Sequence, residues 1–225
     1  TQAISGGGGL TKDGAGTLTL NGVNSYVGET IVGGGTLIVD GDISSSSKTT
    51  VLSGATLGGS GTVGDLIIEA GGTFSPGNSP EITTVAGDYI QNGTLVAEIE
   101  GLVAGPGGHD RVDVSGAITL GGDLSLAFDI FTPVQDDLVF LFLNDGTDAV
   151  SGAFTGLAEG DVAATYAGFD WEISYTGDFD TLAFSGVGND IVIRANAPVA
   201  IPEPHSAILV CLGLMLGVMQ RKRVK

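Results

Sequence analysis

Residues 9–39 read GLTKDGAGTLTLNGVNSYVGETIVGGGTLIV, and the element glycine, threonine, apolar residue occurs twice within them. The same element recurs further along the chain, with alanine replacing glycine once, and its threonines are Thr17, Thr36, Thr56, Thr73 and Thr94. Successive threonines lie 19, 20, 17 and 21 residues apart. A whole element repeated at a period near twenty residues is typical of one coil of a β-solenoid.

Short strand-like segments accompany this repeat, including Thr17–Leu20, Thr36–Val39 and Leu66–Ile68. Aliphatic and β-branched residues favour strands, and the glycines, 39 of 225 residues, supply the turns that each coil needs. The alternative, a meandering β-sandwich, would show turn signals about every 8–12 residues. The longer period favours an all-β chain in which residues 1–130 form a solenoid.

The first repeat also carries a family resemblance. Residues 8–40, and most closely Gly9–Gly22 with its continuation to Leu37, resemble the autotransporter-associated β-strand repeat. Two later segments, Ser75–Pro80 and Asp110–Val114, are similar to the stretch that follows such repeats. The resemblance implies a secreted passenger region that folds as a right-handed parallel β-helix.

The period is lost from about Phe131 onward. Residues 138–143 form a continuous apolar strand candidate, and residues 169–175 alternate, which places one set of side chains on a single face: Phe169, Trp171, Ile173 and Tyr175. A solenoid needs an atypical end to cover its last hydrophobic coil. We therefore predict an irregular β cap over residues 131–196, and a ligand platform is the alternative interpretation of its aromatic row.

Residues 197–225 have a different character. Pro202, Glu203 and Pro204 precede an uncharged apolar run from Ala207 to Met219, and a basic cluster follows, made of Arg221, Lys222, Arg223 and Lys225. Basic residues directly behind an apolar run form a stop-transfer pattern. As a helix the run would cover about 20 Å of a hydrocarbon core about 30 Å thick. We predict a single hydrophobic helix that needs its flanking residues to span, and a buried core helix is the alternative.

This order of elements resembles the PEP-CTERM sorting signal of Gram-negative bacteria. The resemblance implies that an exosortase, a protease-transpeptidase of the inner membrane, recognises Pro202–Pro204 and processes the protein during export. The expected destination is the cell surface, the outer envelope or the extracellular matrix, after transient anchoring in the inner membrane. Because the sequence begins at Thr1 and shows no secretory signal, we expect a further segment upstream.

Composition narrows the classes of partner. The net charge is −18, and setting aside the four terminal basic residues leaves 26 acidic residues against 4 basic ones, or −22. Nucleic acid is therefore not an expected partner, because binding it requires a basic surface. The one cysteine, Cys211, lies in the apolar tail, so the remainder of the sequence has no disulfide.

A carboxylate pair offers the best enzymatic candidate. Glu98 and Glu100 are two residues apart on a predicted strand and would project from its outer face, at a spacing compatible with acid and base roles on a glycosidic bond. Asp178 and Asp180 form a second such pair. With 26 acidic residues in the sequence, the ordinary interpretation is that these pairs solvate a strand face.

Other chemical motifs are weaker. Gly59–Gly64 fits G-x-G-x-x-G but precedes a strand, which disagrees with dinucleotide binding. A catalytic triad on His109 and Asp110 is disfavoured because adjacent residues of an extended chain point apart. No cofactor is expected. Calcium is a remaining possibility, through Asp145 and Asp148 or through Gly188–Asp190, although tandem calcium-binding nonapeptides are missing.

Together these patterns predict an exported, non-enzymatic surface or matrix protein of structural or adhesion type. Its expected partners are the exosortase and, outside the cell, exopolysaccharide of a biofilm matrix or the cell envelope. The alternative function is a β-helical polysaccharide hydrolase or lyase that uses Glu98 and Glu100.

Overall fold

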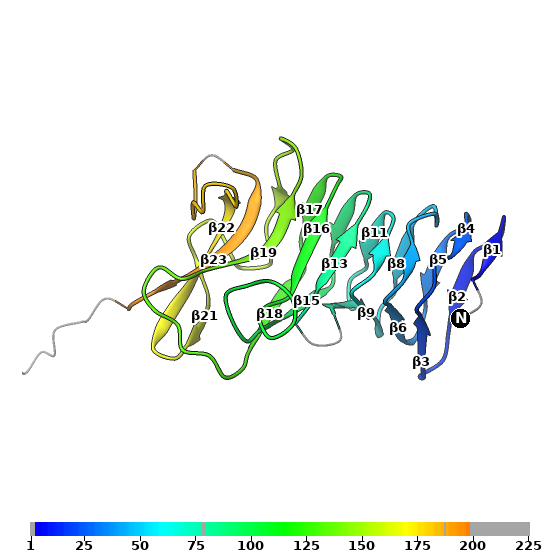
Figure 1. Ribbon diagram of the computed structural model, residues 1–225, viewed down its shortest axis with the longest axis horizontal. Coiled ribbons are helices and arrows are strands. Elements are labelled where there is room, and N and C mark those ends of the chain that lie inside the picture. The colour runs from blue at the N-terminus through cyan, green and yellow to red at the C-terminus, as the bar shows by residue number, and fades with distance from the viewer. Residues whose placement is uncertain (1–2, 78–79, 187, 199–225) are drawn as a thin grey trace, which may run out of the picture.

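A computed structural model describes residues 3–77, 80–186 and 188–198. Within these ranges every regular element is a β-strand and no helix occurs. Most strands pair in parallel and belong to three sheets, whose strands stack along the long axis of the molecule from the N-terminal end (Figure 1). The all-β prediction is therefore confirmed for the described part of the chain.

The chain visits the three sheets in turn. The first sheet contains β2 (Leu10–Lys12), β5 (Thr30–Val32), β8 (Thr49–Val51), β11 (Leu66–Ile68), β14 (Tyr89–Gln91), β17 (Ile118–Leu120) and β20 (Ser151–Gly152). The second sheet contains β3 (Thr17–Leu20), β6 (Gly35–Val39), β9 (Ala55–Gly59), β12 (Thr73–Pro76), β15 (Thr94–Ile99) and β18 (Asp123–Phe128). The parallel part of the third sheet contains β7 (Asp42–Ile43), β10 (Thr62–Val63), β13 (Ile82–Val85), β16 (Arg111–Val114) and β19 (Leu138–Asn144). One strand from each sheet makes one coil, which is the arrangement of a parallel β-solenoid.

The repeated threonines mark the register of the second sheet. They face one another on neighbouring strands, in the order Thr17, Thr36, Thr56, Thr73 and Thr94. One sequence period therefore corresponds to one coil, as the spacing predicts. The hand of the solenoid stays a prediction.

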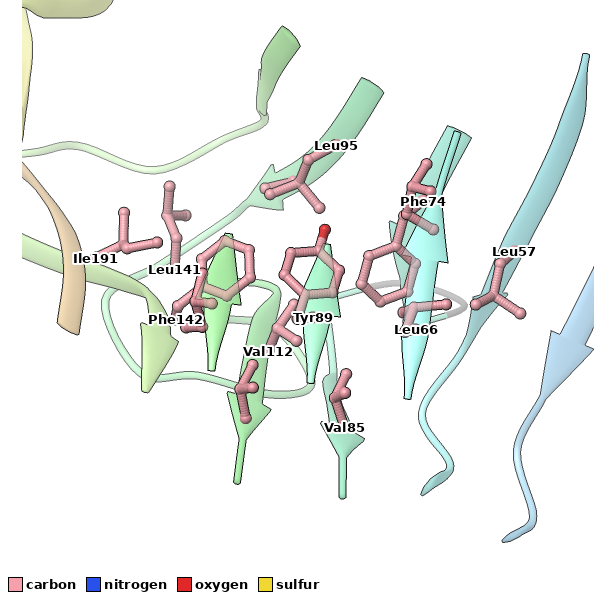
Figure 2. Close-up of a cluster of buried hydrophobic side chains, with 14 of the residues drawn as sticks. Leu57, Leu66, Phe74, Val85, Tyr89, Leu95, Val112, Leu141, Phe142 and Ile191 are labelled. Atoms are coloured by element: carbon pink, nitrogen blue, oxygen red, sulfur yellow. The ribbon is translucent and has the colours of Figure 1, made fainter. Parts of the chain in front are cut away.

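Inward-facing side chains stack from coil to coil. Leu37, Leu57, Phe74 and Leu95 each follow a repeat threonine, and all are at most 1% exposed. Three aromatic rings continue the stack through the centre of the solenoid, with Tyr89 lying between Phe74 and Phe142 at centroid distances of 6.0 and 5.3 Å (Figure 2). The solenoid is therefore held by a continuous apolar core rather than by separate clusters.

Tight corners separate the sheets, and Gly35 shows why they need glycine. Gly35 has φ +64°, and a Cβ at this position would lie 2.4 Å from the carbonyl oxygens of Gly14 and Gly16 on the preceding coil. A larger residue would meet both an unfavourable backbone conformation and a backbone clash.

The C-terminal end of the solenoid changes to antiparallel pairing. β23 (Asp190–Asn196) pairs with β19 and with β22 (Phe169–Gly177), and β22 pairs with β21 (Val162–Tyr166). Parallel pairing itself extends to β19 and β20. At the other end, β1 (Ser5–Gly6) pairs in parallel with β4 (Ser25–Tyr26).

The aromatic row of β22 is mostly core. Trp171 and Ile173 are fully buried and Tyr175 is 8% exposed, while Phe169 is partly buried against the same cluster. The Trp171 ring lies 5.2 Å from that of Phe128, on the last strand of the second sheet. These side chains therefore cover the final coil, and the ligand-platform alternative is not favoured.

The predicted sorting signal, hydrophobic helix and basic cluster, residues 201–225, lie outside the described residues. Within the described ranges, no helix combines the length and the hydropathy needed to cross a membrane.

Candidate functional site

An acidic cleft of about 530 Å³ lies where β16 and β19 of the third sheet end. Two sides of it come from the ends of β16 and β19, and the remainder comes from residues 178–180, which follow β22, and from residues 188–190 at the start of β23. Five aspartates line this cleft: Asp113, Asp145, Asp178, Asp180 and Asp190. The cleft is therefore rich in oxygen ligands and negative charge.

Asp190 connects the walls of the cleft. Its carboxylate accepts the N–H of Asn144 through Oδ1 and the N–H of Phe179 through Oδ2, both at 2.9 Å. Burial raises the pKa of Asp190, the two N–H donors lower it, and the nearby charges of Asp178 and Asp180 raise it further. Both carboxylate oxygens of Asp190 are thus already used to position backbone.

The other aspartates of the cleft have different surroundings. Asp113 forms an ion pair with Arg111, whose Nε lies 2.6 Å from Asp113 Oδ1. Asp178 is partly exposed, and hydrogen bonds from Thr181 lower its pKa. A lowered pKa keeps a carboxyl group ionised, so Asp178 is a poor general acid. The predicted pair Asp178 and Asp180 does lie in one cleft, but the surroundings of Asp178 do not support a role for it as the proton donor of that pair.

The two segments considered for calcium meet in this cleft. Asn189 donates through Nδ2 to the carbonyl of Asp148 at 3.0 Å, and Asp145 and Asp190 line the same space. The two segments are distant in the sequence, and nothing in their spacing predicts that they touch. In the described part of the chain, no group of three or more His, Cys, Asp or Glu side chains is placed to hold a metal ion.

Glu98 and Glu100 lie elsewhere on the solenoid. Glu98 is half-buried on β15 and lines a shallow groove of about 260 Å³ on the second sheet, beside Thr36, Thr56 and Ser75. Glu100 follows the end of β15, and its N–H donates to the carbonyl of Gly108. Glu100 is not among the residues that line this groove, so the fold does not bring the two carboxylates together in it.

His109 and Asp110 are buried at the base of the loop formed by residues 100–110. The ring nitrogens of His109 lie 3.2 Å from the carbonyl oxygen of Gly101 and 3.1 Å from that of Phe140. Burial lowers the pKa of His109, although these carbonyls oppose the shift. A histidine whose nitrogens both face carbonyls has no hydroxyl to activate, so no triad forms here.

Asp110 points away from His109, as an extended chain requires. Its carboxylate oxygens accept the N–H groups of Glu81 and Glu98, each at 2.9 Å. Burial raises the pKa of Asp110 to about 7, opposed by these hydrogen bonds and assisted by the nearby charges of both glutamates. His109 and Asp110 therefore both have structural roles, because their side chains join the loop to neighbouring coils.

The glycine motif at residues 59–64 forms a corner of the solenoid. It covers the end of β9, all of β10 and the turn after it, and β11 follows directly. Phosphate binding by this motif relies on a helix N-terminus, and a strand stands in its place.

Residues 10–39 match the passenger-associated-transport-repeat. The matched stretch runs from the start of β2 to the end of β6, so it includes the first coil and part of the second. The resemblance to an autotransporter-associated repeat over residues 8–40 is thereby confirmed.

Two relatives resemble longer parts of the chain. An extracellular serine protease of Serratia marcescens is 33% identical over 215 residues, which cover 89% of this chain and 20% of that protein. The adhesin BmaC autotransporter of Brucella suis biovar 1 (strain 1330) is 38% identical over 134 residues, which cover 56% of this chain and 4% of the adhesin. The chain thus spans a fifth or less of the length of these relatives.

Proposed function

We propose that this chain is an exported passenger-type β-solenoid that acts at the cell surface or outside the cell as a structural, adhesion-type protein. The observation that carries the proposal is the coincidence of the matched repeat at residues 10–39 with the coils of the solenoid. One relative is named an adhesin autotransporter and the other an extracellular protein, which supports an external location.

The proposed mechanism is mechanical and adhesive. A continuous core joins successive coils into one elongated body, so contacts made at one end are held at a fixed distance from the other. The charge of −18 keeps such a body soluble and repels acidic polymers. Neutral polysaccharide and the surfaces of other cells are therefore the partners that we propose for its outer faces and loops.

An adhesion assay tests this role. Cells of the source organism in which the gene for this protein is deleted should attach less well to a polysaccharide-coated surface and to one another. Re-expression of the protein should restore attachment. Protease treatment of intact cells should remove the protein if it is exposed outside. Unchanged attachment, or full protection from external protease, would contradict the proposed role.

The route to the exterior is a separate proposal. We propose that an exosortase-type enzyme processes the protein. The order of Pro202–Pro204, Ala207–Met219 and the basic cluster supports this proposal. The mass of the mature C-terminus tests it. A terminus between Pro202 and His205 is expected, whereas recovery of intact Lys225 in the membrane fraction would indicate plain anchoring.

The enzymatic alternatives find less support. One relative is named a serine protease, but both ring nitrogens of His109, the one histidine within the described ranges, face backbone carbonyls. A polysaccharide hydrolase or lyase acting through Glu98 would release reducing ends or unsaturated products from neutral or acidic polysaccharides. We expect no such products from either the wild type or Glu98→Gln. Product formation that Glu98→Gln abolishes would establish the enzyme instead.

A further inference from the structure

Two loops leave the solenoid at the same corner, near its C-terminal end. Residues 100–110 follow β15 and residues 129–137 follow β18, and these strands are neighbours at the end of the second sheet. The strands pair in parallel up to Ile99 and Phe128, and the N–H of Asp129 donates to the carbonyl of Ile99 at 3.0 Å. The two segments, which we call the corner loops, therefore start side by side (Figure 1).

Both corner loops carry exposed apolar side chains. Val103 is 80% exposed in the first loop and Ile130 is 93% exposed in the second, and Leu102 and Val134 beside them are exposed as well. Residues 101–108 read GLVAGPGG and contain no charged side chain. A single exposed apolar residue is ordinary, whereas apolar side chains gathered on adjoining loops mark a contact surface.

The described chain ends beside the second corner loop. The N–H of Ala197 donates to Gln135 Oε1 at 2.6 Å, and Gln135 Nε2 donates to Asn196 Oδ1 at 3.0 Å. Residues 198–206 connect this point to the apolar run Ala207–Met219. Such a connection spans at most about 35 Å even when fully extended. A membrane that holds the apolar run is therefore within reach of the corner loops.

We propose that the apolar side chains of the corner loops enter the headgroup region of the membrane that holds Ala207–Met219, so that the solenoid stands with its C-terminal end on the lipid. This inference rests on the proposed sorting route, in which that run enters a membrane. Because the connection is short, it keeps the loops at a high effective concentration near the surface. A small apolar area is then sufficient for contact.

The charges around the loops select the kind of lipid. Exposed Asp129 directly precedes Ile130, and exposed Asp136 lies two residues after Val134. Carboxylates are repelled by anionic headgroups and attracted by the ammonium groups of zwitterionic ones. Phosphatidylcholine and phosphatidylethanolamine therefore fit this surface better than an anionic phospholipid does.

Site-specific fluorescence of the full chain in phosphatidylcholine vesicles tests the proposal. Cys211→Ser removes the one native cysteine. In that background Val103→Cys and Ile130→Cys each receive a polarity-sensitive fluorophore, and the lipids carry a nitroxide quencher close to the headgroups. Both probes should shift to the blue and lose most of their emission. Val23→Cys is the matched control, because Val23 is 70% exposed but follows β3, four strands from β15, and its probe should stay unquenched.

A fluorophore on wild-type Cys211, with nitroxides on the lipid tails, separates this inference from the sorting route. Quenching at Cys211 without quenching at Val103 and Ile130 would overturn the loop contact alone. Absence of quenching at Cys211 would overturn the membrane anchoring and the loop contact together. Equal quenching at Val23 would mean that the solenoid lies along the membrane, and a blue shift without quenching would indicate contact with a second copy of the chain. Either result would also overturn the proposal.

Discussion

Asp110 accepts the backbone N–H of Glu98 at 2.9 Å, across a separation of twelve residues in the sequence. The bond closes the base of the loop formed by residues 100–110, and the other carboxylate oxygen joins this base to Glu81 on the preceding coil. A buried, ionisable group thus holds two coils together, which makes solenoid stability depend on pH.

The first prediction concerns this pH dependence. The pKa of Asp110 rises from 3.8 to about 7 in the folded protein, so the folded state binds a proton that the unfolded state releases. Its contribution to stability is therefore complete below about pH 4 and is lost as pH rises towards 7. The free energy of unfolding should fall by at most about 4 kcal/mol through this group.

Comparison with Asp110→Asn isolates that effect from the other carboxylates. The variant loses one backbone hydrogen bond, at a cost of about 1–3 kcal/mol, but cannot titrate. Urea unfolding between pH 4.5 and 8 measures the free energy of unfolding of both proteins. As pH rises, the wild type should lose more of this free energy than the variant does. A constant difference would mean that the two N–H donors keep Asp110 ionised throughout.

The second prediction compares two glycines in order to separate the cost of a positive φ from the cost of a steric clash with the preceding coil. Gly14 and Gly35 both have positive φ, but a Cβ at Gly14 meets nothing within 4 Å, whereas one at Gly35 would lie 2.4 Å from two carbonyl oxygens. Gly14→Ala should cost about 1–2 kcal/mol of unfolding free energy. Gly35→Ala should lower the unfolding free energy by clearly more in the same chemical-denaturation experiment. Equal losses would show that the backbone at this corner shifts to accommodate a Cβ.

The third prediction concerns the aromatic stack in Figure 2. Phe142 is fully buried against Tyr89, so Phe142→Ala should reduce the unfolding free energy by about 3–5 kcal/mol. Val103→Ala is the matched control, because Val103 is 80% exposed, and its effect should stay within about 0.5 kcal/mol. Similar losses in both variants would contradict a core that is continuous through the solenoid.

The fourth prediction concerns the loop itself. His109→Ala removes the ring that reaches the carbonyls of Gly101 and Phe140. Amide hydrogen exchange in residues 100–108 should accelerate, while β11 and β14 keep their protection. His109→Gln retains a donor and should recover part of the protection. Exchange that accelerates uniformly along the chain would mean that His109 supports the whole solenoid instead of the loop.

The solenoid could be predicted because its causes are local and repeated. The spacing of Thr17, Thr36 and Thr56 equals one coil, since each coil needs the same strand and the same glycine corner. The core role of Trp171 also followed from alternation, because a strand with one apolar face must bury it. The periodicity of the sequence therefore predicted the architecture and most of the core.

The acidic cleft could not be predicted in the same way. Residues 144–148 and 188–190 are polar, irregular segments, and no period relates them. They meet because β23 pairs antiparallel with β19, and this pairing brings Asn144 and Asp190 into contact. Likewise, nothing local indicated that Asp110 would bond to Glu81 rather than to solvent.

By itself, the sequence determined the all-β class, the period of the coils, the passenger-type repeat and the acidic surface, because each is a property of composition or of regular spacing. Only the tertiary structure decided that Glu98 and Glu100 do not share the groove on the second sheet, that His109 faces carbonyls, and that two polar turns enclose one cleft. Such contacts depend on which distant strands pair at the end of the solenoid, where the repeat that fixes the register has ended.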